Sequence, residues 1–372
     1  MRPIALTPVF AALFIVTAGP ALAADDAATL EDLKRQLAAQ QAQIDALATN
    51  DEPADDTPSR THIGGYGELH YNAFDSKTEL DFHRFVLYFA HEFADDIRFY
   101  SEFELEHALA GEGKKGEVEL EQAYIEMDLA EDTRLKAGVF LLPVGILNET
   151  HEPTTFYGVE RNPVETNIIP STWWEGGVAV DGVLGAGDWH YDLALHSGLN
   201  VTNAFAIRSG RQKVSEAVAE ELATTARLRY TGVAGLELAA SVTYQSDITQ
   251  GLVTGAGAGM LLTTHATYED GAFSARALWA AWSLDGAAPA AAGKDQQDGA
   301  YAEAGWKFTP KVGAFARYNL WDNGGVGVTE RSQSNIGINW WPHPNVVFKF
   351  DVQDQGKSVD DDGFSLGVGY RF

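Results

Sequence analysis

Charged side chains are the residues of this 372-residue chain that could do chemistry, and their sign changes along the sequence. They often alternate with apolar residues, so the charged side chains of one segment share a face. The early segments carry mostly acid on that face: Glu68, Glu102, Glu104, Glu106, Glu119, Glu121, Glu126 and Asp128. The later segments carry mostly base: Arg227, Arg229, Arg276, Lys307, Arg317, Lys349 and Arg371. Charges arranged in this way can attract, orient or repel dissolved ions.

Two interpretations of these charges stay open. Acidic and basic walls that face each other across a lumen would create a transverse field, which orients dipolar or charged solutes without holding them tightly. Alternatively, neighbouring charges form salt bridges that only satisfy a wet interior. The candidate pore-lining residues are Arg84, Arg98, Arg134, Lys136, Arg161, Arg227, Arg229, Arg276, Lys307, Arg317, Glu102, Glu104, Glu149, Glu152 and Glu165, and the field interpretation places the three loop acids Glu149, Glu152 and Glu165 opposite arginines.

Candidates for a catalytic site are weak. A hydrolase would need His, Asp or Ser side chains close together, and the nearest pairs are His196–Ser197 and His151–Glu152. Adjacent residues of a strand point to opposite faces, so His196 and Ser197 would not cooperate within a strand. The pair His151–Glu152 has no nucleophile beside it. We therefore expect no enzyme and no cofactor, with a barrel hydrolase as the weaker alternative.

Metal and phosphate-loop motifs are also missing from the sequence. The early histidines His62, His70, His83, His91 and His107 have no H-x-x-x-H spacing, and the chain has no cysteine. The sequence therefore predicts scattered histidines rather than a metal site, and it excludes disulfides and thiolate chemistry. The glycines near residue 65 belong to an alternating segment and open no helix, so they do not form a phosphate-binding loop.

The elements that must position these residues are strands. From residue 62 to the end, apolar and polar residues alternate with a period of two, in about sixteen segments bounded by turn residues. In 346–353, for example, Phe348, Phe350 and Val352 alternate with charged or amide side chains. A lipid-spanning sheet has to close on itself so that no backbone group stays unpaired in hydrocarbon. We predict an all-β, sixteen-stranded antiparallel transmembrane barrel over residues 62–372.

The connections predict how the barrel is oriented. Short links alternate with longer polar ones, and an even number of strands places both chain ends at the short-turn rim, on the periplasmic side. The third long connection, 141–173, lacks alternation but begins with apolar residues that could pack on a barrel wall. We interpret it as a loop folded into the pore; an ordinary external loop is the alternative.

Three segments precede the predicted barrel. Residues 1–23 read as a signal peptide, with a basic start, an apolar run and a small-residue cleavage site. Residues 24–49 carry Leu30, Leu33, Leu37, Ile44 and Leu47 at heptad spacing, which predicts a short coiled coil in the periplasm. Residues 50–61 read as a disordered acidic linker. Cleavage removes Arg2 and no acid, and so leaves 25 basic and 53 acidic residues and a formal charge of −28. This charge argues against nucleic acid as a partner.

A family resemblance supports the same kind of barrel. The pattern of Gly138, Phe140, Pro143 and Gly145, followed by Phe156 and the pair Glu160–Arg161, resembles the phosphate-selective porin O and P family. The resemblance implies a sixteen-stranded homotrimeric porin whose third loop narrows the pore and whose arginines and lysines guide anions. The expected function is a water-filled channel for passive diffusion of small ions or solutes, including anions such as phosphate.

The expected location is the outer membrane of a Gram-negative bacterium. The expected partners are outer-membrane lipid, the solutes in transit and the barrel-assembly machinery, which would recognise the C-terminal Phe372. A non-conducting structural or adhesive barrel is the alternative function.

Overall fold

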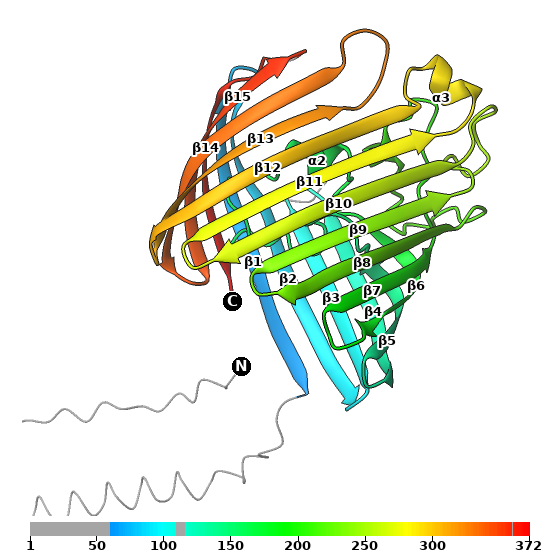
Figure 1. Cartoon of the computed structure of the whole chain (residues 1–372), viewed down its shortest axis with the longest axis horizontal. Helices are drawn as coiled ribbons and strands as arrows, with labels where there is room; N and C mark the ends of the chain where they lie inside the picture. Colours follow the sequence, from blue (N-terminus) through cyan, green and yellow to red (C-terminus); the bar gives the residue numbers. More distant parts are fainter. Residues whose placement is uncertain (1–59, 109–115, 359) are drawn as a thin grey trace, which may run out of the picture. The chain divides into compact units, whose positions relative to one another are not determined.

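The computed structural model describes residues 60–108, 116–358 and 360–372 (Figure 1). The predicted signal peptide, coiled coil and linker, up to residue 59, therefore lie outside the described residues. Chain contacts divide the protein into Met1–Ser59 and Arg60–Phe372, and only the second unit is described below. No described helix is long and apolar enough to cross a membrane.

Sixteen antiparallel strands form one closed barrel, in which each strand pairs with its sequence neighbours and β1 pairs with β16. This confirms the strand number and the closure predicted from the alternation. The strands are β1 (Thr61–Phe74), β2 (Thr78–Ala94), β3 (Ile97–Glu106), β4 (Val118–Ala130), β5 (Thr133–Leu141), β6 (Trp174–Leu184), β7 (Trp189–His196), β8 (Ala223–Val233), β9 (Leu236–Gln245), β10 (Gly259–Asp270), β11 (Phe273–Leu284), β12 (Gln296–Thr309), β13 (Val312–Asp322), β14 (Glu330–His343), β15 (Val346–Lys357) and β16 (Gly363–Arg371).

The wall separates an apolar outer face from a polar inner face. In β15, Phe348, Phe350 and Val352 have exposed fractions between 41% and 47%, whereas the alternate residues Lys349 and Asp351 are at most 5% exposed. Exposed aromatic and aliphatic side chains suit lipid, and the polar residues between them face the interior. The alternation of apolar and polar residues therefore indicates which residues face lipid and which face the interior.

The two rims differ in their connections. Links of two to four residues join β2 to β3, β4 to β5 and the later pairs at one rim, and all the longer loops leave from the other. The last residue closes the short-turn rim, because Gly65 N donates to Phe372 O at 3.0 Å and Phe372 N donates to Gly65 O at 2.9 Å. One connection at the long-loop rim is nevertheless short, between Phe74 and Thr78.

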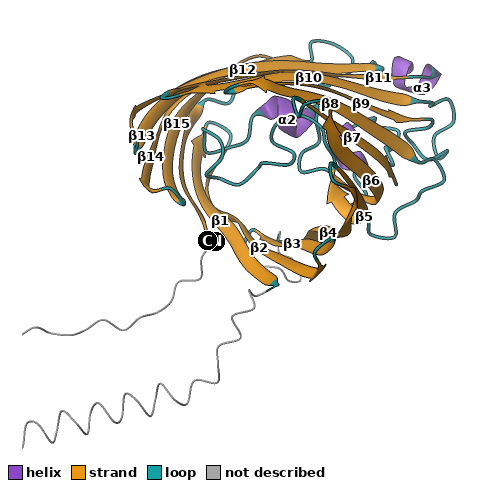
Figure 2. Cartoon of the chain, turned by 60° about the horizontal axis from the view of Figure 1, so that its bottom comes forward, coloured by secondary structure: helices purple, strands orange, loops and turns teal. Residues whose placement is uncertain are grey.

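The loop between β5 and β6 runs inside the barrel (Figure 2). It contains the short helix α2 (Pro163–Asn167), which begins where the Asn162 side chain accepts a hydrogen bond from Glu165 N at 2.9 Å. Its apolar residues pack against the wall: Ile168 and Trp173 are fully buried in one cluster with Trp282 of β11. The Trp282 indole also donates to Ile168 O at 2.9 Å. We call residues 142–173 the inner loop. Two further short helices, η1 (Ile207–Gly210) and α3 (Ala287–Ala291), lie in other long loops.

Candidate functional site

The inner loop is held in the lumen by basic and acidic side chains of the wall. Lys349 Nζ donates to Gly158 O at 2.7 Å, and Arg276 Nη2 donates to Thr155 O at 2.7 Å. Asp351 Oδ2 accepts a hydrogen bond from Val159 N at 2.7 Å. These wall charges therefore bind the loop backbone, and they fix the shape of the passage beside it.

Glu160 is the loop carboxylate that joins the wall at β1. It accepts hydrogen bonds from His70 Nδ1 at 2.9 Å and from Asn72 Nδ2 at 2.8 Å. Burial alone would raise the pKa of Glu160, but attraction to His70 and these hydrogen bonds outweigh it and lower the pKa below its ordinary value. The lowered pKa keeps Glu160 ionised at neutral pH.

Next to Glu160, three arginines from two loops converge on one cavity of about 440 Å³. Arg161 belongs to the inner loop, and Arg208 and Arg211 belong to the loop between β7 and β8. We call these three residues the arginine cluster. Arg208 Nη1 donates to Thr166 O at 3.1 Å and to Ser171 O, and Arg211 Nη1 donates to Thr172 O. Backbone carbonyls hold the two guanidinium groups in place without neutralising them.

Within the described part of the chain, the arginine cluster has no direct ion-pair partner. Among the described residues, no carboxylate oxygen lies within 4.0 Å of a guanidinium nitrogen of Arg161, Arg208 or Arg211. Burial lowers the pKa of all three groups, and at Arg208 repulsion from Arg211 and Arg161 adds to the effect. A positive charge that is both desolvated and unpaired favours an anion beside it.

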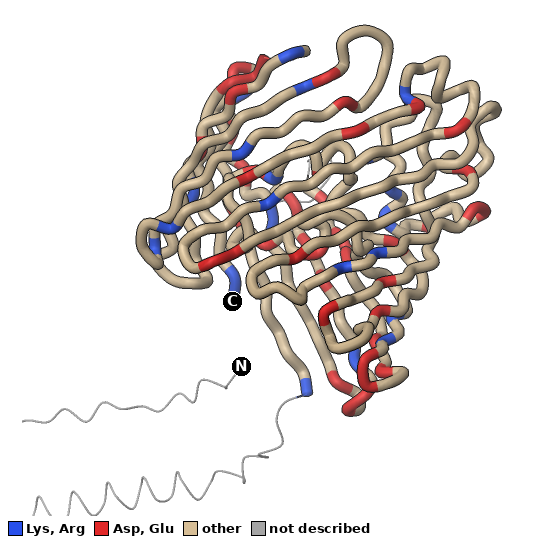
Figure 3. Tube along the Cα trace, in the orientation of Figure 1, with Lys and Arg blue, Asp and Glu red and all other residues tan. Residues whose placement is uncertain are grey.

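The opposite charge lies at the edge of the same cavity. Glu106, Glu117 and Glu119 also line it, and their carboxylate oxygens approach one another closely enough to form an acidic group. Lys213 Nζ partly neutralises this group through ion pairs with Glu119 and, at 2.5 Å, with Glu117. Figure 3 places residues of both signs along the strands and inside the barrel. Basic and acidic residues thus line the same cavity.

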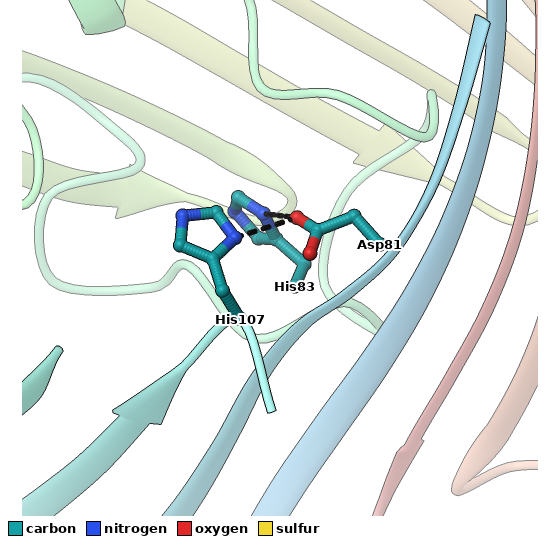
Figure 4. A group of neighbouring side chains, drawn as sticks. All are labelled: Asp81, His83 and His107. Carbon is teal, nitrogen blue, oxygen red and sulfur yellow. Dashed lines mark hydrogen bonds and ion pairs between the residues drawn. The ribbon is translucent and has the colours of Figure 1, made fainter. Parts of the chain in front are cut away.

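Two of the early histidines meet on the carboxylate of Asp81 (Figure 4). His107 Nδ1 lies 2.8 Å and His83 Nδ1 lies 3.3 Å from Asp81 Oδ2. Asp81 and His83 lie two residues apart in β2, as side chains on one strand face do, and the pairing of β1 with β2 slips by one residue between Glu68 and His70. The sequence predicted scattered histidines here, because no spacing motif links His107 to His83.

Most of the predicted pore-lining cations have a carboxylate partner on the wall. The ion pairs are Arg84–Glu68, Arg98–Glu126, Arg98–Asp128, Arg134–Asp181, Lys136–Asp181, Arg227–Glu149, Arg227–Asp192, Arg229–Glu237 and Arg317–Glu303. Arg276 holds the inner loop, and Lys307 lies 4.9 Å from the ring centre of Trp341. Pairwise neutralisation thus describes much of the wall, whereas Arg276, Lys307, Lys349 and the arginine cluster have no carboxylate within 4.0 Å among the described residues.

The predicted acids occupy different places. Glu165 is fully buried and binds Ile146 N, Leu147 N and the Tyr301 hydroxyl, so it anchors the inner loop. Glu102 and Glu104 are buried under that loop, whereas Glu152 is half-buried. The residues predicted from the sequence did not include Arg208, Arg211 and Lys213, although three basic residues within six positions of a polar loop were a usable signal.

The pair His196 and Ser197 has separate partners. His196 Nε2 lies 3.0 Å from Thr225 Oγ1, and Ser197 Oγ donates to Glu175 Oε2 at 2.5 Å. Ser197 follows the last residue of β7 and is buried against a carboxylate. The two side chains therefore do not form the hydrogen-bonded relay that a nucleophile and its base need.

A closed sixteen-stranded barrel with an apolar outer face, a polar interior and an inward loop defines an outer-membrane porin. Residues 64–361 match the family model described as phosphate-selective porin O and P, and the chain belongs to this family, as its motifs predicted. Family and fold together are those of a passive diffusion channel of the outer membrane rather than of an enzyme.

Solved porins with similar folds share little sequence. An anion-selective porin from Comamonas acidovorans is 9% identical, with a TM-score of 0.60, and the match covers 84% of this chain and 99% of that one. The outer membrane channel DcaP of Acinetobacter baumannii is 14% identical, with a TM-score of 0.58, and the match covers 84% and 97%. OmpT of Vibrio cholerae in its trimer form is 9% identical, with a TM-score of 0.55, over 84% and 99%.

A curated relative from Aquifex aeolicus, described as an uncharacterized protein, is 38% identical over 178 residues. The match covers 45% of this chain and 40% of that relative. It therefore supports the kinship of part of the chain without assigning an activity.

Proposed function

We propose that this porin passes small anions and that the arginine cluster selects them. The observation that carries the proposal is the convergence of Arg161, Arg208 and Arg211 on one cavity, with no carboxylate of the described residues within 4.0 Å of their guanidinium nitrogens. Guanidinium groups donate in a planar fork that matches phosphate and carboxylate oxygens. An anion that passes the inner loop would exchange part of its water for these donors.

The acidic side of the cavity would keep the interaction weak. Glu106, Glu117 and Glu119 line the same cavity and repel an anion, so the arginines would attract it without trapping it. This arrangement is a local form of the transverse field considered from the sequence. No catalytic residue is needed for such a channel, and we propose none.

The test records ion currents through the refolded mature chain in a planar bilayer. Addition of phosphate should inhibit the chloride current, and Arg208→Gln or Arg211→Gln should weaken this inhibition by about tenfold, the effect of about one charge-assisted hydrogen bond. Lysine at either position should restore part of the inhibition.

The matched control is Arg229→Gln, because Arg229 lies on β8 and is paired with Glu237 at 3.5 Å. It should leave the phosphate inhibition unchanged. Equal inhibition in all variants would contradict the selective role of the arginine cluster.

We also propose that the short-turn rim faces the periplasm, together with the N-terminal segment, and that the chain assembles as a homotrimer. The short-turn and long-loop asymmetry supports the orientation, and the trimer of Vibrio cholerae OmpT supports the assembly. The exposed C-terminal Phe372 would serve as the mark for the barrel-assembly machinery. Protease added outside intact cells should cut the long loops and leave the N-terminal segment intact.

A further inference from the structure

A buried polar cluster lies between the inner loop and the wall, and Thr172 connects it to the arginine cluster. Glu102 and Glu104 come from β3, Glu121 comes from β4, and His151 comes from the inner loop. All four residues are at most 3% exposed. Three carboxylates buried this deeply need compensation, because a buried charge without a partner destabilises the folded state.

His151 presents one ring nitrogen to this cluster. Its Nδ1 lies 3.2 Å from Asn148 O, and because a carbonyl only accepts, Nδ1 carries the proton. Nε2 then faces Glu121 Oε2 at 3.4 Å and Glu102 Oε1 at 3.6 Å. Neither contact is a hydrogen bond, and among the described residues both Nε2 and Glu121 Oε2 are buried without a hydrogen-bond partner.

The two carboxylates are oriented by hydrogen bonds to their outer oxygens. Thr172 Oγ1 donates to Glu121 Oε1 at 2.9 Å, and Gln122 Nε2 donates to Glu102 Oε2 at 2.7 Å. The remaining oxygens, Glu121 Oε2 and Glu102 Oε1, therefore point at His151. Glu102 Oε1 also accepts a long hydrogen bond from the Tyr66 hydroxyl, at 3.4 Å. In metal sites, the ligand side chains are typically oriented by hydrogen bonds to carbonyl, hydroxyl or amide groups that do not themselves bind the metal.

The spacing of the inner atoms fits an ion. The three donor atoms of Glu102, Glu121 and His151 all lie within 4.8 Å of one another. A tetrahedral ion with bonds of about 2.0–2.1 Å separates its ligand atoms by about 3.3 Å, close to the observed separations from His151 Nε2. Glu104 lies beside Glu121, and both of its oxygens are buried with no hydrogen-bond partner in the described part of the chain. It could supply a fourth ligand.

We propose that Glu102, Glu121 and His151, with Glu104 beside them, bind a divalent transition-metal ion such as Zn²⁺. Imidazole nitrogen with carboxylate oxygen suits zinc and its neighbours in the first transition row. The ion would join β3, β4 and the inner loop at one point, and so clamp the loop to the wall. The inference goes beyond the proposed anion selectivity and does not depend on it.

The positive charge of Arg84 would repel such an ion. Its Nε donates to Glu68 at 2.6 Å, and its Nη2 donates to His151 O at 2.7 Å. Arg84 thus has a carboxylate of its own and also helps to place His151. An ion bound between the carboxylates would favour their ionised forms and a neutral His151.

The second candidate for metal binding provides the control. Asp81, His83 and His107 also offer three ligand atoms within 4.8 Å, but here both imidazoles already hydrogen-bond to the carboxylate, at 2.8 and 3.3 Å. These three residues are half-buried, and each imidazole already has the Asp81 carboxylate as its hydrogen-bond partner (Figure 4). We expect them to bind zinc more weakly than the cluster around His151.

The test uses the full mature protein in detergent, stripped with a chelator, mixed with one equivalent of Zn²⁺ and passed over a desalting column. Elemental analysis should find about one zinc per chain, and calorimetry should show at least about a tenfold loss of affinity in His151→Ala and Glu121→Gln. The control His83→Ala/His107→Ala should retain the zinc. Co²⁺ in place of Zn²⁺ should give visible absorption bands of a tetrahedral ion in the wild type and in this control, and not in His151→Ala.

Two further measurements keep the outcome decisive. Each variant should stay heat-modifiable on gels and form open channels, so that lost zinc is not lost folding. Zinc should raise the unfolding temperature of the wild type and not of His151→Ala. A conducting protein that binds no zinc, or one that loses zinc only in the His83→Ala/His107→Ala variant, would overturn the metal site and leave the proposed channel function untouched.

Discussion

At the scale of single residues, buried carboxylates decide where the inner loop lies. Glu165 Oε1 accepts from Ile146 N and Leu147 N at 2.6 Å each, and Oε2 accepts from the Tyr301 hydroxyl at 2.8 Å. One side chain thus orders the start of the loop, caps α2 through Asn162 and connects both to β12. These donors compensate the buried charge of Glu165. Replacement of Glu165 should therefore destabilise the inner loop more than the barrel.

We predict that Glu165→Gln destabilises the inner loop by about 2–4 kcal/mol, because hydrogen bonds to a charged acceptor are lost and an amide meets donors that it cannot satisfy. Tyr301→Phe removes a single donor and should cost less, about 1–2 kcal/mol. Limited proteolysis of the folded barrel measures both effects through cleavage between residues 142 and 173. Equal resistance of all three proteins would contradict the anchoring role.

Glu160 predicts how the loop responds to acid. Its pKa is lowered, so its contribution to stability is complete above the ordinary carboxyl pKa of 4.5 and is lost as the pH falls through the lowered value. The wild-type loop should therefore resist pepsin at pH 4.5 and become sensitive at lower pH. Glu160→Gln should be more sensitive at pH 4.5 already, with a flatter pH profile. A wild-type profile that breaks above pH 5 would show that Glu160 does not control the response.

At the scale of elements, the alternation of apolar and polar residues makes the wall. It was readable from the sequence because a strand shows two faces with a period of two, as in 346–353. The partners across the lumen were not readable, since Lys349 and Gly158 lie 191 residues apart in sequence. The contact of His107 with Asp81 was equally hidden, because the two residues lie 26 positions apart on different strands or loops.

The candidate site was predictable only in part. Glu160 and Arg161 stood out through a family motif, whereas Arg208 and Arg211 sit in a loop without periodicity. Arg227 was a predicted pore-lining residue, and Glu149 and Asp192 neutralise it, as the salt-bridge interpretation allowed. Which cation stays unpaired depends on three-dimensional neighbours, and a linear sequence does not contain that information.

The outer face of β15 provides a test at this scale. Phe350 is 41% exposed among apolar neighbours, so Phe350→Arg would place a charge in hydrocarbon. We predict a loss of about 2–4 kcal/mol in folding free energy into lipid vesicles, as for a cation at the bilayer midplane. Phe350→Leu keeps the position apolar and should cost less than about 1.5 kcal/mol. If arginine were tolerated as well as leucine, Phe350 would not face lipid.

At the scale of the whole molecule, the segment before the barrel would stabilise the proposed trimer. The heptad spacing of 24–49 predicts self-association, and an acidic linker would connect it to β1. We predict that a chain beginning at residue 62 still forms open channels but has a trimer that dissociates at a lower temperature. Semi-native gels of heated samples measure this. Identical dissociation temperatures would contradict a stabilising coiled coil.

The formal charge of the whole chain and the charge of the arginine cluster favour ions of opposite sign. The whole chain carries a formal charge of −27, which by itself would favour cations near the pore. The arginine cluster favours anions locally, beside the inner loop. Selectivity therefore shows whether the local site or the overall charge controls transport.

The most direct test is the zero-current potential of wild-type channels in a planar bilayer under a KCl gradient. We predict the sign of an anion-selective channel, and a shift towards cation selectivity when Arg161, Arg208 and Arg211 are all changed to glutamine. A cation-selective wild type whose potential is unchanged by these substitutions would contradict selection of anions by the arginine cluster.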